Sequence, residues 1–105
     1  MAVMGQIRGG TVGGGDSEPI AERQNSVSFT ANVNKTITLT NVRKVAGGFV
    51  FNSGIPKYFA FYYDGTQWQT WQTGSGFQFI SASDYEVVLK YDGSYSFDVI
   101  ICGVE

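Results

Sequence analysis

The residue types that usually carry out enzyme chemistry are scarce in this chain. Among its 105 residues there is no histidine and a single cysteine, Cys102. The lack of histidine excludes Ser–His–Asp and Cys–His machinery and most zinc sites, and one cysteine cannot form an intramolecular disulfide. We therefore expect no catalytic residues, no metal site and no cofactor. We expect Cys102 to be a buried thiol in the last strand, with an intermolecular disulfide as the alternative.

Two carboxylates remain as candidates for acid–base catalysis. Asp64 and Asp92 each precede a glycine, in Tyr63-Asp64-Gly65-Thr66 and Tyr91-Asp92-Gly93-Ser94. A general acid and a general base need to lie together in a cleft with their pKa values pushed apart. Asp before Gly is instead typical of a turn, because the side chain accepts hydrogen bonds from the local backbone. We expect a hairpin turn at both places.

The segment Gln67-Trp68-Gln69-Thr70-Trp71-Gln72-Thr73 offers binding chemistry rather than catalysis. Trp68 and Trp71 are three residues apart, so on a regular strand their side chains point to opposite faces. An exposed indole beside amides and hydroxyls suits a protein interface or the C–H face of a sugar ring. The candidate interface or glycan platform therefore comprises Trp68, Gln69, Trp71 and Tyr62. A bulge that places both indoles in the core is the third interpretation.

The elements that must position these side chains are predicted to be strands throughout residues 26–105. Apolar and polar residues alternate over 27–33 and again over 36–40, with a tight turn expected at Asn34-Lys35. Further strands are expected near 45–51, 58–63, 67–71, 77–80, 85–91 and 95–102. About eight short strands separated by turn residues predict an all-β fold, a small antiparallel β-sandwich or jelly roll.

Residues 1–25 differ in composition and predict an extended arm. Six of the 14 glycines lie in the first 15 residues, and none of the aromatic residues precedes Phe29. Ordering so much glycine costs more than the arm can recover by burial, so an ordered arm needs a host surface. Residues 16–22 have the sequence features of one helical turn. The arm's candidate partner-binding residues are Val3, Met4, Ile7, Arg8 and Val12.

Charge and hydropathy narrow the classes of partner. A net charge of −2 gives no electrostatic basis for binding nucleic acid. No run of about 18 apolar residues predicts a membrane span, and the N-terminus lacks the apolar stretch of a secretory signal. Basic residues concentrate in 26–60 and acidic ones in 61–105. That asymmetry suits head-to-tail packing of copies, unless the strands interleave the two halves.

The layout of the whole chain resembles small accessory proteins of tailed-phage particles, such as capsid decoration, collar and tail-associated proteins. A Gly-rich arm, Gly5-Gln6-Ile7-Arg8-Gly9-Gly10-Thr11-Val12-Gly13-Gly14-Gly15, precedes a minimal aromatic-rich β-sandwich. The resemblance implies a non-enzymatic structural subunit of a virion, assembled in the host cytoplasm. It implies docking through the arm on other virion proteins and on copies of the chain itself, often as trimers or higher rings. A carbohydrate-binding module that uses exposed Trp and Tyr residues is the alternative.

Overall fold

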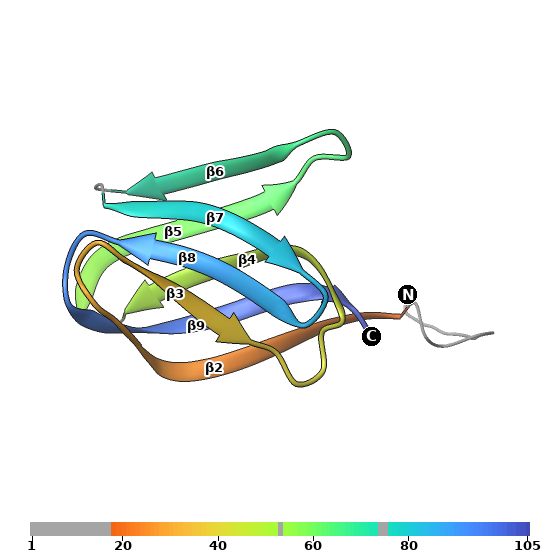
Figure 1. Cartoon of the computed structure of the whole chain (residues 1–105), viewed down its shortest axis with the longest axis horizontal. Helices are drawn as coiled ribbons and strands as arrows, with labels where there is room; N and C mark the ends of the chain where they lie inside the picture. The colour runs from red at the N-terminus through yellow and green to blue at the C-terminus, as the bar shows by residue number, and fades with distance from the viewer. Residues whose placement is uncertain (1–17, 53, 74–75) are drawn as a thin grey trace.

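The chain folds into a β-sandwich of eight antiparallel strands in two sheets, which confirms the expected fold class (Figure 1). The computed structural model describes residues 18–105 except 53, 74 and 75. The strands are β2 (Pro19–Phe29), β3 (Val33–Thr38), β4 (Lys44–Asn52), β5 (Ile55–Tyr63), β6 (Trp68–Thr73), β7 (Phe77–Ser83), β8 (Glu86–Tyr91) and β9 (Tyr95–Val104). No helix within these described ranges is long and apolar enough to cross a membrane.

The two sheets differ in size. The larger one has the strand order β2-β9-β4-β5-β6, and the smaller one has the order β3-β8-β7. Strand β9 comes from the acidic second half of the chain, yet it lies between β2 and β4 from the first half. The two halves are therefore interleaved in the larger sheet, as the second interpretation of the charge pattern requires.

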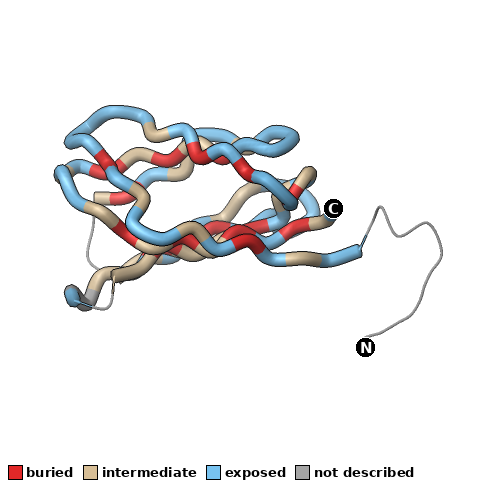
Figure 2. The backbone as a smooth tube through the Cα atoms, turned by 90° about the horizontal axis from the view of Figure 1, so that it is seen from below, coloured by how far each residue is buried: buried red, intermediate tan, exposed pale blue. Residues whose placement is uncertain are grey.

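The core lies between the facing sides of the two sheets, where the buried stretches of the backbone gather (Figure 2). Aromatic rings and aliphatic side chains build it together. Alternation along β9 turns Phe97, Val99 and Ile101 inward, where all three are buried. Phe59 of the larger sheet stacks on Phe77 of the smaller one, with ring centroids 5.3 Å apart. Such pairs add about 0.5–1.5 kcal/mol each to the burial of their apolar area. They fix how the two sheets sit on each other.

Two of the expected turns are wrong. Asn34 and Lys35 lie inside β3, because the chain turns before them, at residues 30–32. Asn32 takes the left-handed backbone conformation there, with φ 59°, which asparagine tolerates better than most residues. The Asp92-Gly93 turn closes no hairpin, since it connects β8 in the smaller sheet to β9 in the larger one. Asp64-Gly65 does close the β5–β6 hairpin, as expected.

Strand β2 begins at Pro19, inside the range 1–25 that the sequence assigns to the arm. Residues 19–24 pair with β9, so they belong to the sheet. The expected helical turn is wrong where the structure describes it, because residues 19–22 are extended. Proline fits the start of this edge strand, since it has no N–H to donate. Val3, Met4, Ile7, Arg8 and Val12 lie outside the described residues.

A buried carboxylate joins β2 to the segment that links the two sheets. Glu22 is 8% exposed, and its carboxylate accepts the N–H groups of Thr40 (2.9 Å) and Asn41 (2.7 Å) and the side-chain amide of Gln24 (2.8 Å). Burial alone raises the pKa of a carboxyl group, but these hydrogen bonds outweigh it and hold the pKa of Glu22 below its ordinary value. The residues between β3 and β4 are thereby held against the larger sheet.

Candidate functional site

Aromatic side chains gather on the outer side of the larger sheet. Val50, Phe59 and Phe61 face the core, so their neighbours along β4 and β5 point the other way. Strand pairing sets Trp71 beside Ala60, and Ala60 beside Phe49. We call the surface formed by five of these outward residues the aromatic face: Phe49, Phe51, Tyr58, Tyr62 and Trp71.

The aromatic face combines exposed rings with rings that are held in place. Trp71 is 58% exposed, Tyr62 50% and Tyr58 38%. Phe49 and Phe51 lie beside them on β4 and are half-buried. The ring of Phe49 stacks on Tyr58 at 5.8 Å between centroids and lies 5.6 Å from Phe51. Phe49, Phe51 and Tyr58 therefore form a packed group of rings, and Trp71 and Tyr62 extend the same face along β5 and β6.

A charged rim borders the aromatic face on the side of β2 and β9. The Arg23 guanidinium lies 5.3 Å from the ring centroid of Phe51 and donates a hydrogen bond to the Asp98 carboxylate at 3.0 Å. Asp98 also accepts the N–H of Ser26, at the bulge in β2 where Ser26 has φ 56°. An apolar centre with a polar rim is the usual anatomy of a protein interface.

The two tryptophans point to opposite sides of β6, as their spacing predicts. Trp71 lies on the aromatic face, and Trp68 packs at the edge of the core, stacked on Phe79 with ring centroids 4.5 Å apart. The interpretation with both indoles in the core is wrong, because the regular pairing of β6 with β5 contains no bulge. The structure brings Trp71, Tyr62 and Gln69 to the outer side and separates Trp68 from them.

Three members of the aromatic face were not singled out as site residues from the sequence: Phe49, Phe51 and Tyr58. A signal for them is present in Tyr58-Phe59-Ala60-Phe61-Tyr62-Tyr63, which is apolar or aromatic at every position. A strand with one side exposed to water alternates apolar and polar residues. A continuous apolar run is instead typical of a strand that is covered on both sides.

Asp64 serves the turn that carries it, as expected. Its carboxylate accepts the N–H groups of Gln67 and Thr66, both at 2.8 Å, and the side-chain amide of Gln69 at 2.9 Å. The hydrogen bonds from Gln67, Gln69 and Thr66 lower the pKa of Asp64. Asp92 belongs to a different connection, between β8 and β9. Across the part of the chain that the structure describes, no group of three or more His, Cys, Asp or Glu residues is placed to hold a metal ion.

Cys102 is exposed, so the expectation of a buried thiol is wrong. The alternation of β9 explains the difference, because Val99, Ile101 and Gly103 point inward and leave Cys102 on the outer side. Its neighbours across the sheet are Ala21 and Gly47, two residues with little or no side chain to cover the thiol.

Comparison with known proteins yields no relative. No protein-family model matches the chain, and no curated protein or solved structure matches it either.

Proposed function

We propose that the chain is a non-enzymatic assembly subunit that binds other protein subunits through its aromatic face. The observation that carries this proposal is the gathering of Trp71, Tyr62 and Tyr58, all exposed, on one side of one sheet. Trp and Tyr are enriched at the energetic centres of protein interfaces, where each buries about 150–250 Å². Contiguous apolar patches on the surface of a domain mark interaction sites, whereas scattered apolar residues do not.

The polar groups beside Trp71 favour a protein partner over a sugar on this face. The Gln69 amide already donates to Asp64, and the Thr73 hydroxyl already accepts the N–H of Tyr58 at 3.1 Å. These bonds use part of the capacity of the two side chains to bind sugar hydroxyls, since only the Gln69 carbonyl, its second N–H and the Thr73 O–H remain. A protein surface with apolar side chains of its own needs mainly the aromatic area. The alternative in which Trp71, Tyr62 and Gln69 bind a glycan is therefore less supported than a protein interface.

The layout of the chain supports assembly of this subunit on a virus particle. In the phage accessory proteins that this chain resembles, an arm of this kind docks on the lattice formed by other virion proteins. Here β2, an edge strand of the sheet that bears the aromatic face, begins at Pro19, four residues after the last glycine of the Gly-rich stretch 5–15. In the proposal, Val3, Met4, Ile7 and Val12 anchor the arm on a neighbouring subunit, and Arg8 supplies its charged contact. Ordering the arm on docking costs entropy, which limits affinity but lets a short segment cover a long seam.

The amount of the chain in purified particles tests the proposal. Particles from the source that encodes the chain are compared with particles in which the chain carries Trp71→Ala or, as a matched control, Ile80→Ala. Ile80 is 40% exposed but lies on β7 of the smaller sheet. Quantitative mass spectrometry is expected to show an at least tenfold lower content of the Trp71 variant and an unchanged content of the Ile80 variant. Equal incorporation of both contradicts the proposed role of the face.

Truncation tests the role of the arm separately. Removing residues 1–16 leaves every described strand intact, because β2 begins at Pro19. We expect the truncated chain to unfold at the same urea concentration as the full chain and to be absent from particles. Normal incorporation of the truncated chain refutes the docking role of the arm. That result does not bear on the proposed role of the aromatic face, because the truncation removes none of its residues.

A further inference from the structure

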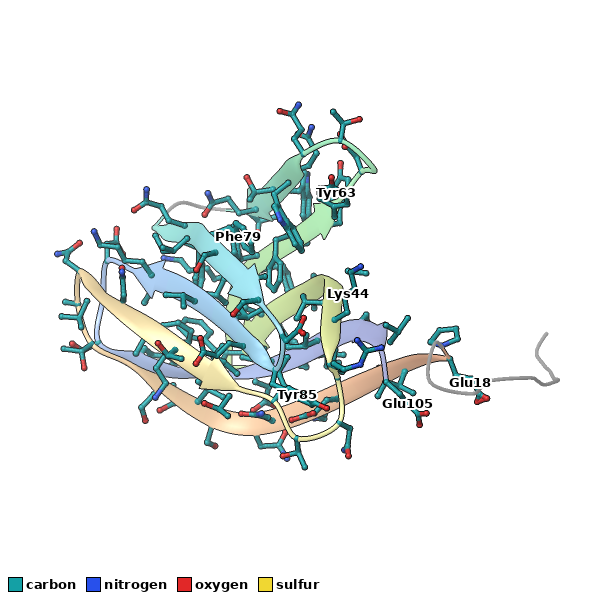
Figure 3. All side chains as sticks on the ribbon, turned by 45° about the vertical axis from the view of Figure 1, so that its right-hand side comes forward. Glu18, Lys44, Tyr63, Phe79, Tyr85 and Glu105 are labelled. Atoms are coloured by element: carbon teal, nitrogen blue, oxygen red, sulfur yellow. The ribbon has the colours of Figure 1, made fainter. Side chains whose placement is uncertain are left out.

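The sandwich is open at one end, where β5 and β7 finish and β4 and β6 begin. A hollow of about 340 Å³ lies there between the two sheets. Lys44, at the start of β4, and Tyr63, at the end of β5, belong to its lining and are labelled at this end in Figure 3. Pockets that hold small molecules measure about 300–1,000 Å³, so this hollow has room for one small ring rather than a chain of them.

An aromatic corner forms part of the lining. The rings of Tyr63 and Trp68 lie 5.5 Å apart between centroids and are inclined at 60° to each other. Trp68 stacks on Phe79 with an interplanar angle of 26°, so the orientation of its indole is fixed by the core. The aliphatic side chains of Val45 and Ala82 complete the apolar part of the lining.

Polar groups of both charges share the lining with this corner. Lys44, Ser83 and Asp84 line the same hollow. The Lys44 ammonium and the Asp84 carboxylate make no hydrogen bond or ion pair with any residue that the structure describes. The hollow therefore offers a cationic donor, an anionic acceptor and a hydroxyl that are free to bind a ligand. With one charge of each sign, it suits a ligand that is neutral overall.

The backbone on two sides of the hollow is held in place before any ligand binds. The hydrogen bonds to Asp64 shape the turn between Tyr63 and Trp68. On the opposite side, the N–H of Tyr85 donates to the carbonyl of Arg43 at 3.0 Å, which ties the turn that bears Asp84 to the residue before Lys44. A site that is ordered in advance loses less entropy on binding.

We propose that this hollow binds a single neutral pyranose ring. The C–H face of the ring packs against Tyr63 and Trp68, as apolar area against an aromatic wall. The ring hydroxyls donate to the Asp84 carboxylate and accept from the Lys44 ammonium. The site lies between the sheets and shares no residue with the aromatic face, so it does not depend on the proposed assembly role.

The two tryptophans allow the site to be tested with single-tryptophan chains. In the full chain carrying Trp71→Phe, the only remaining indole is Trp68 in the hollow; in the chain carrying Trp68→Phe, it is Trp71 on the aromatic face. Both chains are titrated with glucose, galactose, mannose and N-acetylglucosamine, free and as their α- and β-methyl glycosides. We expect at least one sugar to change the Trp68 emission saturably, with a dissociation constant in the millimolar range typical of one-ring ligands. The Trp71 emission is expected to stay constant.

Substitutions of the polar groups complete the test. In the Trp71→Phe background, Asp84→Asn and Lys44→Met are each expected to weaken binding at least tenfold, and Glu86→Gln, a nearby exposed carboxyl outside the hollow, to leave it unchanged. The proposal is overturned if no sugar changes the Trp68 emission, if both substitutions leave the affinity unaltered, or if Trp71 reports the same change. Binding of one methyl anomer identifies the terminal residue of a glycan as the ligand, and rejection of both anomers identifies the free sugar.

Discussion

The outer surfaces of the two sheets differ in polarity. The outer surface of the smaller sheet is mostly polar. It is formed by Asn34, Thr36, Thr38, Gln78, Ser81, Glu86 and Lys90, with the apolar residues Ile80 and Val88 among them. The larger sheet shows the aromatic face instead. In β8 the outward Glu86 and Lys90 alternate with residues that face the core, as in a sheet with one side exposed to water, whereas residues 58–63 of β5 are apolar or aromatic on both sides. Residues 58–63 of β5 thus have the composition of a strand covered on both faces, and in the proposal the partner subunit covers the outer one.

The contrast also separates two uses of aromatic residues within one strand. Phe59 and Tyr58 are neighbours in β5, yet Phe59 is buried between the sheets and Tyr58 is on the aromatic face. If the inner rings maintain the fold and the outer rings bind a partner, a substitution on the inner side lowers the free energy of unfolding. A substitution on the outer side instead weakens binding and leaves the free energy of unfolding nearly unchanged.

The largest expected effect is on stability and comes from the inner side. Phe59→Ala removes a fully buried ring that stacks on Phe77 and is expected to cost about 3–5 kcal/mol in the free energy of unfolding. Tyr58→Ala removes one stacking partner of Phe49 and is expected to cost about 0.5–1.5 kcal/mol. Urea unfolding followed by circular dichroism measures both. Similar losses from the two variants would erase the distinction between the inner and outer rings.

The next effect is on binding and comes from the outer side. Trp71→Ala is expected to weaken attachment to the partner subunit by about 2–4 kcal/mol, in the range of an interface hot spot, while changing the free energy of unfolding by no more than about 0.5 kcal/mol. Competition between variant and wild-type chain for incorporation into particles measures the first, and urea unfolding the second. A large loss of stability with normal incorporation would assign Trp71 to the fold instead.

A smaller effect is expected where the two sheets are joined. Glu22→Gln replaces a carboxylate that accepts the N–H groups of Thr40 and Asn41, and is expected to cost about 1–3 kcal/mol at neutral pH. The pKa of Glu22 is lower in the folded chain than its ordinary value of 4.5, so its stabilising contribution is complete above that pH. The contribution is lost as the pH falls through the lower, folded-state pKa.

Unfolding of the wild-type and Glu22→Gln chains across this pH range measures the effect. The difference between them is expected to shrink as the solution becomes more acidic. Glu86→Gln, on the exposed polar face, serves as the control and is expected to change stability by no more than about 0.5 kcal/mol. A difference at Glu22 that persists unchanged into acid would show that the charge of its carboxylate is irrelevant.

The smallest effect is expected on the polar face. Thr36→Ala removes an exposed hydroxyl from β3 and is expected to change the free energy of unfolding by no more than about 0.5 kcal/mol. Incorporation into particles is expected to be unchanged as well, which competition with the wild-type chain measures. Loss of incorporation by this variant would mean that both faces of the sandwich are covered in the assembly, and the contrast between them would then lose its functional meaning.

The sequence predicts the fold class, most strands and the opposite orientations of the two tryptophans, because these depend on local alternation. It does not predict which strands share a sheet, since that depends on pairing between distant segments such as β2 and β9. The Asp92-Gly93 connection illustrates the limit. Its residues are those of a hairpin turn, but the strand that follows pairs elsewhere.

The candidate site was predictable only in part, for a related reason. Trp71, Tyr62 and Gln69 are near one another in sequence, whereas Phe49 and Phe51 join them only through the pairing of β4 with β5. The exposure of Cys102 depends on the phase of alternation in β9. That phase is set by the contacts of Phe97 and Val99 with the core and not by the cysteine itself.

Photocrosslinking at the aromatic face tests the central claim most directly. The photoreactive residue p-benzoylphenylalanine is placed at position 71 in one chain and at position 80, on the smaller sheet, in another, and purified particles that contain each chain are irradiated. We predict that position 71 forms a covalent adduct with a second protein subunit and that position 80 does not. An adduct from position 80 with none from position 71, in particles that incorporate both chains, would contradict the claim that the aromatic face is the surface of assembly.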